Sequence, residues 1–228
     1  MIFVTGDTHG LTDYAKLVKF GKDNYALTKN DYVIIAGDCG IVWSKKSLAE
    51  RVEAYERLPF SVLFVDGNHE NFDMLDAFCV ETFCGGKVHR ISEHIRHLMR
   101  GQVFEMQGKT IFTMGGAESE DRIYRTEGES WWKQETPSQE DLEEGLKNLA
   151  LHGNKVDFII SHSCDASALY YPPLLKWGCM PKVNPTNMLL SVFNDNVEYK
   201  RWFFGHYHAD GELNETKRAL YYDILKLD

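Results

Sequence analysis

Cysteine and long apolar segments are both scarce in this sequence. The chain of 228 residues has five cysteines, at positions 39, 79, 84, 164 and 179, an odd number with no CxxC pair. That usage argues against a disulfide scaffold and favours reduced thiols. No apolar run approaches the roughly 20 residues that span a bilayer, and the start lacks the basic segment of a signal peptide. We therefore expect a cytoplasmic protein with no membrane partner.

Basic residues are also in deficit. Lysine and arginine number 25 against 34 aspartates and glutamates, which gives a formal net charge of −9. That sign argues against duplex nucleic acid as a partner, because such binding uses basic surfaces. It does not exclude anionic substrates, since bound metal ions supply local positive charge. The 43% of apolar residues can build one sizeable core, and we expect a single domain over residues 1–228.

The first third of the chain alternates strand and helix patterns. Three apolar, β-branched runs predict buried strands, at Ile2–Thr5, Tyr32–Ala36 and Val62–Val65. Between the second and third, an apolar face at helical spacing ends before Pro59. The order βαβαβ predicts a parallel sheet covered by helices, and hence an α/β fold.

The rest of the chain has shorter strand patterns and two capped helices. Four short runs in the middle predict an antiparallel meander: Val88–Ile91, Ile95–Met99, Val103–Met106 and Thr110–Met114. Helices are predicted after the capping residues Ser138 and Asn184. Further strands are predicted at Val156–Ile160, Arg201–Phe204 and Ala219–Leu225, with a proline-rich loop over 171–181.

A long segment without periodicity, 115–137, separates the meander from the next helix. Loops of this length are uncommon unless they are functional or disordered. It contains Arg122, Arg125 and the pair Trp131-Trp132. Arginine is well suited to binding phosphate, so one hypothesis is a substrate-binding flap that uses Arg122 and Arg125. The alternative is a surface loop anchored by two core tryptophans.

Five polar clusters each follow a predicted strand directly. They are Gly6-Asp7-Thr8-His9-Gly10, Gly37-Asp38, Gly67-Asn68-His69-Glu70, Ser161-His162 and Gly205-His206-Tyr207-His208. Ligand sites in open α/β sheets collect at the carboxyl ends of strands, so these clusters should converge. Carboxylates, imidazoles and an amide oxygen suit Mn, Fe or Zn. In extended backbone the i, i+2 pairs would point to one side. One such pair alone usually means nothing, but five polar clusters, each at the end of a predicted strand, together indicate a metal site.

The set of clusters resembles the calcineurin-like metallophosphoesterase superfamily. That family's pattern is D-x-H, G-D, G-N-H-[DE], a single His and G-H-x-H, and all five occur here in order between Asp7 and His208. The resemblance implies a β-sandwich flanked by helices and a phosphoester hydrolase with two divalent or mixed-valence metal ions. It implies Asp7, His9 and His208 on one ion, Asn68, His162 and His206 on the other, and Asp38 between them.

The resemblance also implies the reaction. A hydroxide bridging the two ions would attack phosphorus in line, and His69, which is not a metal ligand in this scheme, would assist the leaving group. The substrate would be a phosphate ester of unspecified identity. The alternatives are a serine/threonine protein phosphatase, a nuclease, or a metal-binding scaffold without catalysis.

One cluster departs from the protein phosphatase branch of that superfamily. The branch has G-D-x-x-D-R-G where this chain has Gly37-Asp38-Cys39-Gly40-Ile41-Val42-Trp43. Ile41 and Val42 thus replace an aspartate that orients the catalytic histidine and an arginine that binds phosphate. The partner of His69 stays open, with Asp66 and Glu70 nearby in sequence. The histidines at 89, 94, 97 and 152 lie off the clusters and are expected at the surface or at caps.

Overall fold

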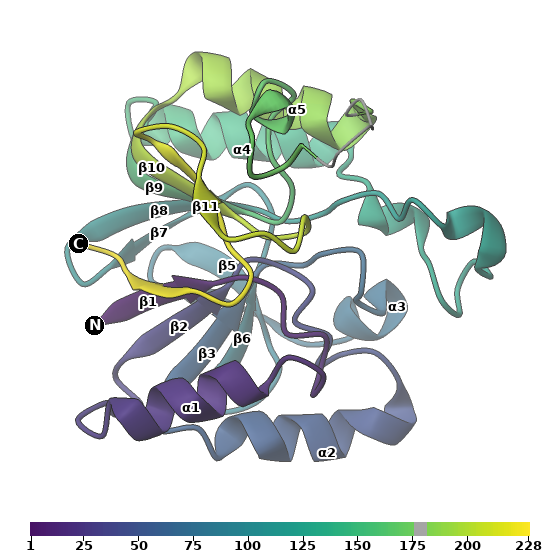
Figure 1. Cartoon of the computed structure of the whole chain (residues 1–228), viewed down its shortest axis with the longest axis vertical. Coiled ribbons are helices and arrows are strands. Elements are labelled where there is room, and N and C mark those ends of the chain that lie inside the picture. Colours follow the sequence, from purple (N-terminus) through teal and green to yellow (C-terminus); the bar gives the residue numbers. More distant parts are fainter. Residues whose placement is uncertain (176–181) are drawn as a thin grey trace.

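The β-branched runs of the sequence form two sheets that face each other, with helices on both outer faces (Figure 1). This computed structural model describes residues 1–175 and 182–228, so 176–181, within the proline-rich loop, lie outside the described residues. The helices are α1 (Ala15–Asp23), α2 (Lys45–Glu56), α3 (Phe72–Leu75), α4 (Gln139–Leu151) and α5 (Pro185–Asn196). Short 3-10 turns occupy Arg122–Tyr124, Lys133–Glu135 and Ala168–Tyr170. None of the described helices combines the length and the apolar character that crossing a bilayer requires.

The first sheet has the order β13-β1-β2-β3-β6-β5-β4. Its strands are β1 (Ile2–Thr5), β2 (Tyr32–Ile35), β3 (Ser61–Phe64), β4 (Val80–Phe83), β5 (Gly86–Arg90), β6 (Ile95–Leu98) and β13 (Ile224–Lys226). The pairs β1–β2 and β2–β3 are parallel, and α1 and α2 connect them. The predicted βαβαβ half is therefore confirmed.

The second sheet has the order β11-β12-β10-β9-β8-β7. Its strands are β7 (Gln102–Met106), β8 (Lys109–Met114), β9 (Lys155–Ser161), β10 (Glu198–Phe204), β11 (Gly211–Glu212) and β12 (Lys217–Ala219). The pairs β8–β9 and β9–β10 are parallel. Their carboxyl ends therefore lie together, as those of β1, β2 and β3 do in the first sheet.

Two details of the predicted strands differ. The middle strands form two antiparallel hairpins in different sheets, β5–β6 in the first and β7–β8 in the second. The predicted strand Ala219–Leu225 is wrong, because it divides into β12 in one sheet and β13 in the other. Asp210 causes the break: its carboxylate accepts the backbone N–H groups of residues 221, 222 and 223 at 2.8–3.0 Å, which removes them from any strand ladder.

Three apolar clusters hold these layers together. One lies between the sheets and includes Val4 and Ile34 from the first and Phe104 and Ile160 from the second. The second packs α4 and α5 on the second sheet, and the third packs α1 and α2 on the first (Figure 1). The capping side chains of Ser138 and Asn184 accept backbone N–H bonds at the starts of α4 and α5, as predicted.

Candidate metal centre

The five polar clusters meet where the carboxyl ends of strands from both sheets lie side by side. Their loops are sharply turned: His9, Asp38, His206 and His208 all have positive φ, between 46° and 67°. Such backbone is costly outside glycine and tends to persist at functional sites. The expectation of extended i, i+2 pairs is therefore wrong for these residues. The turned backbone sends His206 and His208 to different neighbours.

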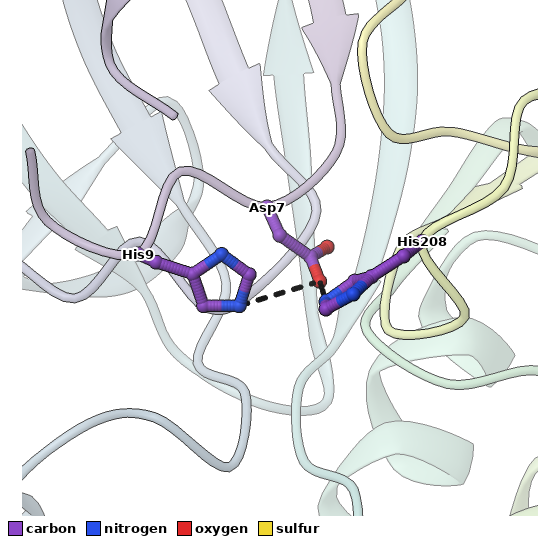
Figure 2. A group of neighbouring side chains, drawn as sticks. All are labelled: Asp7, His9 and His208. Carbon is purple, nitrogen blue, oxygen red and sulfur yellow. Dashed lines mark ion pairs between the residues drawn. The ribbon is translucent and has the colours of Figure 1, made fainter. Parts of the chain in front are cut away.

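Asp7 lies between two imidazoles (Figure 2). Its Oδ2 is 3.2 Å from His208 Nε2 and 4.0 Å from His9 Nε2. That oxygen is fully buried and has no hydrogen-bond donor among the described residues. Gly205 makes the room, because a Cβ there would lie 2.2 Å from Asp7 Oδ1. A buried carboxylate oxygen without a donor, facing two imidazoles, fits a cation as its missing partner.

Asp38 occupies the centre of the cluster. Its Oδ2 lies 3.5 Å from His9 Nε2, and its Oδ1 lies 3.2 Å from His162 Nε2. Despite burial, the neighbouring His162 and His9 hold the pKa of Asp38 well below its usual range. Asn68 completes this side, with Oδ1 3.3 Å from His162 Nε2. One oxygen of the Asp38 carboxylate therefore faces His9, and the other faces His162 and Asn68.

Two of the histidines have the tautomer that metal binding needs. His9 Nδ1 donates to Asp13 Oδ2 at 2.8 Å, and His162 Nδ1 donates to the carbonyl of Ala36 at 2.8 Å. Engaging one ring nitrogen leaves the Nε2 lone pair for a ligand. Burial opposes the charged rings, but the surrounding carboxylates raise the pKa of His9 to about 9 and of His162 to about 10. Without metal, Nε2 of both rings therefore holds a proton at neutral pH, and a metal ion bound there would displace it.

His206 faces the second group. Its ring centroid is 5.0 Å from that of His162, and its backbone N–H donates to Asp7 Oδ1 at 3.0 Å. Burial and the nearby His162 lower the pKa of His206 to about 4, so its ring is neutral. All seven predicted ligand residues thus lie in one place.

His69 lies next to Asp38, and its side chain lines a cavity beside the cluster. Its ring packs against His9 at 5.4 Å between centroids and against Trp43 at 5.9 Å. Burial, with the positive charges of Arg125 and His9, lowers the pKa of His69. Its backbone N–H donates to Asp38 Oδ1 at 2.8 Å. By distance alone, His69 could also join His9 and Asp38 around an ion.

Comparison with known proteins shows to which family the chain belongs. A sequence model of the calcineurin-like phosphoesterases matches residues 1–210 of the chain. The chain belongs to the calcineurin-like phosphoesterase family. The predicted family and α/β fold class are therefore confirmed, as is the prediction of an enzyme, a metal-dependent phosphoesterase.

Two solved structures were also found to be similar. A protein of unknown function from Aquifex aeolicus has 17% identity and a TM-score of 0.36, covering 71% of this chain and 77% of its own. The phosphopantetheinyl hydrolase PptH from Mycobacterium tuberculosis has 16% identity and a TM-score of 0.42, covering 96% and 87%. A comparison with curated proteins found no match.

Neither carboxylate near His69 in sequence contacts its ring in this phosphoesterase. Glu70 is fully buried and accepts the backbone N–H groups of Gly67 at 2.7 Å and Gly40 at 3.1 Å, which ties two of the motif loops together. Burial and Asp38 raise the pKa of Glu70 to about 8. Ile41 and Val42 are both fully buried in the core and offer no polar group to the site.

Asp66 points away from the centre into a second network. It accepts from His97 Nε2 at 3.1 Å and from Arg100 Nε at 2.9 Å, and His97 Nδ1 lies 3.0 Å from His89 Nδ1. His89 and His97 are 5% and 4% exposed, so their expected place at the surface or at a cap is wrong. Antiparallel pairing of β5 with β6 places the two rings directly opposite each other.

The 115–137 segment lies against the centre and extends beyond the two sheets (Figure 1). Ser119 Oγ accepts from Asn68 Nδ2 at 3.3 Å, and the buried Trp132 packs against Trp43 at 5.8 Å. Arg125 pairs with Asp121 at 2.8 Å. Arg122 is exposed and lines a cavity of about 350 Å³ with Ser119. The segment thus combines a buried anchor with two arginines on its outer part.

Two residues at the rim of the centre are not among the predicted site residues. Arg51 on α2 and Trp43 after β2 line a cavity of about 170 Å³ with His9, Gly40 and His69. Arg51 lies outside every motif. The available signal was its i, i+4 spacing from Tyr55, the buried residue of α2, which places both side chains on the same face of the helix. Trp43 lies five residues after Asp38 in the loop of the second cluster, and an aromatic side chain so near a motif was the available signal.

Proposed function

We propose that this phosphoesterase hydrolyses phosphate esters with two transition-metal ions, Mn, Fe or Zn, held by the seven clustered side chains. The observation that carries the proposal is the buried Asp7 Oδ2, which has imidazoles on two sides and no hydrogen-bond donor among the described residues. The hydrogen bonds of His9 and His162 support it, because each engages Nδ1 and leaves Nε2 directed at Asp38, where a metal ion would take the place of a proton.

The two groups of side chains suggest how the ions are shared. We assign Asp7, His9 and His208 to the first ion and Asn68, His162 and His206 to the second. Asp38, with one oxygen toward His9 and the other toward His162, would serve both. This donor set is mixed in nitrogen and oxygen, which suits Mn, Fe or Zn better than Ca or Mg.

The chemistry follows from that arrangement. When bound, two such ions would lower the pKa of a coordinated water molecule and would polarise the phosphoryl oxygens. His69, next to Asp38, would hold a proton on a ring nitrogen and give it to the leaving oxygen. Trp43 packs beside that ring, with 5.9 Å between the ring centroids. Arg122 and Arg125 would bind the substrate from the 115–137 segment.

Replacing His69 by alanine tests this proposal. We expect the metal content of His69→Ala to match the wild type, while kcat on p-nitrophenyl phosphate falls by about 10²- to 10⁴-fold, the usual contribution of proton transfer. His152→Ala, at a half-buried histidine far from the centre, is the control and should keep full activity. Loss of an ion in His69→Ala would make His69 a ligand, and an unchanged rate would remove it from the reaction.

A substrate panel separates the remaining functions. Metal-loaded protein should be assayed on bis-p-nitrophenyl phosphate, p-nitrophenyl phosphate, nucleotides, a phosphopeptide and single-stranded DNA. The apolar Ile41 and Val42 favour small phosphate esters over phosphoproteins, because the orienting aspartate and phosphate-binding arginine of protein phosphatases are missing there. Two bound ions with no turnover of any substrate would favour a non-catalytic scaffold.

A further inference from the structure

The cavity beside His69 is lined by basic and aromatic side chains. Its lining residues are His9, Gly40, Trp43, Arg51 and His69, and its volume is about 170 Å³. His9 and His69 both line this cavity, and His9 also lies 3.5 Å from Asp38, so the cavity adjoins the cluster around Asp38. A substrate group that accepts a proton from His69 would leave on this side, so the cavity is where a leaving group would lie.

Arg51 brings an unbalanced positive charge to the cavity. Its guanidinium donates to the carbonyl of Gly40, and no ion pair within the described ranges involves it. Six other arginines each pair with a carboxylate: Arg57, Arg96, Arg100, Arg125, Arg201 and Arg218. In a chain with net charge −9, a half-buried arginine without a carboxylate is suited to an anion from outside.

The structure makes room for that guanidinium. Gly10 has φ of 68°, and a Cβ there would lie 2.7 Å from Arg51 Cζ. Gly40 accepts from Arg51 on one side and has its own N–H held by the buried Glu70 on the other. The arginine is therefore held at the rim by the same loops that carry His9 and Asp38.

Trp43 brings a fixed aromatic surface to the same cavity. Its ring is tilted by 35° to that of His69, and Trp132 packs on it edge to face at 79°. Trp132 is itself held by a hydrogen bond from Nε1 to Asp73 Oδ2 at 2.9 Å. An indole held in this way loses little entropy when a planar ring stacks on it, and such stacking contributes strongly to the binding of nucleobases.

We propose that Arg51 and Trp43 form a subsite for a leaving group that carries both a planar ring and a second phosphate, which makes nucleoside polyphosphates the substrate class. This inference rests on the proposed function. In the reaction, water supplies the oxygen that bonds to phosphorus, and the bond from phosphorus to the leaving oxygen breaks. A nucleotide then leaves with a proton on that oxygen.

Four substrates separate the two features of the leaving group. ATP and diadenosine tetraphosphate carry the ring and the second phosphate, tripolyphosphate carries only the phosphate, and p-nitrophenyl phosphate carries only the ring. For Arg51→Met we expect kcat/KM to fall at least tenfold further on ATP and tripolyphosphate than on p-nitrophenyl phosphate. For Trp43→Leu the larger fall, about fivefold, is expected on ATP relative to tripolyphosphate.

The controls distinguish binding from folding. Arg51→Lys keeps the charge and should recover part of the loss on ATP. Arg90→Met, at an exposed arginine on β5, should match the wild type on every substrate. Equal losses on all four substrates in Arg51→Met would overturn the subsite, as would faster hydrolysis of an acidic phosphopeptide than of ATP.

Binding of ADP, measured by calorimetry on the metal-loaded chain, separates this inference from the proposed function. ADP binding that weakens at least tenfold in Arg51→Met supports the subsite even if nothing is hydrolysed. Hydrolysis of p-nitrophenyl phosphate without any ADP binding would overturn the subsite and leave the phosphoesterase activity standing.

Discussion

A buried chain of hydrogen bonds links Asp66, His97 and His89. The carboxylate of Asp66, at one end of the chain, decides which nitrogen donates and which accepts. Although burial opposes it, Arg100 and His97 keep the pKa of Asp66 well below its ordinary value, so this carboxylate can only accept. His97 Nε2 must then donate to Asp66, which leaves its Nδ1 to accept from His89 Nδ1–H. Burial, together with His97, lowers the pKa of His89 to about 4.

His89 should therefore make the fold sensitive to acid. The unfolded chain takes up a proton at this residue near pH 6.5 and the folded chain only near pH 4, so the stabilisation is complete above 6.5 and is lost as the pH falls toward 4. One pKa unit is worth about 1.4 kcal/mol. His89 lines a cavity together with Asp66, His97 and Arg100, and solvent there reduces the effect. Between pH 7 and 4, we therefore expect the free energy of unfolding of His89→Asn to fall by roughly 1 to 2 kcal/mol less than that of the wild type.

Urea unfolding of the metal-free protein across that pH range measures the difference. His94→Asn is the matched control, because His94 is half exposed and its ring Nε2 lies 3.9 Å from Glu93 Oε1, while the hydrogen bond of its backbone N–H to Glu56 does not depend on the side chain. The control should follow the wild-type curve. Identical pH dependence in His89→Asn and the wild type would contradict the assignment of His89 as a neutral buried ring.

At the scale of elements, the 115–137 segment is held at both ends by Asp66 and Arg100. The backbone N–H of Gly116 donates to the carbonyl of Asp66 at 2.9 Å, and Arg100 Nη2 donates to the carbonyl of Gln134 at 2.6 Å. Asp66 directly precedes the loop that carries Asn68 and His69. The two ends of the segment are therefore fixed near the loop that carries Asn68 and His69, and Ser119 of the segment contacts Asn68.

The two arginines of the segment should act on substrate and not on metal. We expect Arg125→Ala to raise KM about fivefold or more, because its charge lies close enough to His69 to lower the pKa of that ring and is suited to a phosphate oxygen. Arg122→Ala should have a smaller effect in the same direction, since the side chain is exposed and stacks over Trp131 at 6.0 Å. Steady-state kinetics with metal analysis on each variant measures both.

Lys133→Ala provides the control on the same segment. Lys133 is exposed and pairs with Glu127 at 3.0 Å, so its removal changes the charge of the segment by the same amount as an arginine variant. Its KM should equal that of the wild type. Wild-type kinetics in both arginine variants would show instead a surface loop anchored by Trp132.

Local signals predicted most elements, and long-range contacts explain the misses. Caps and strands depend on residues that are neighbours in sequence. The helix caps at Ser138 and Asn184 and the strands before each motif could therefore be predicted from the sequence. The division of 219–225 between two sheets depends on Asp210, and the burial of His89 depends on the pairing of β5 with β6. Arg51 at the rim likewise depends on how α2 packs against the first two motif loops, which no spacing in the sequence reveals.

For the whole molecule, the candidate ligands come from both sheets. Asp7, Asp38 and Asn68 follow strands of the first sheet, whereas His162 and the pair His206 and His208 follow strands of the second. Metal ions at this centre would join the two sheets at one end of the apolar core between them. Binding should therefore stabilise the folded chain as a unit, because the unfolded chain separates the ligands.

Thermal unfolding of the chelated protein against increasing Mn²⁺ tests that coupling. At a free concentration of about 100 times Kd, binding adds about 2.7 kcal/mol, which for a chain of this size raises Tm by roughly 5 to 10 °C. Asp38→Asn should lose most of the rise, because Asp38 lies between both groups of ligands. Asp23→Asn, at an exposed carboxylate paired with Lys19, should keep all of it. An equal rise in Asp38→Asn and Asp23→Asn would mean that Mn²⁺ binds elsewhere on this acidic protein, and no rise in the wild type would mean that the centre does not hold Mn²⁺.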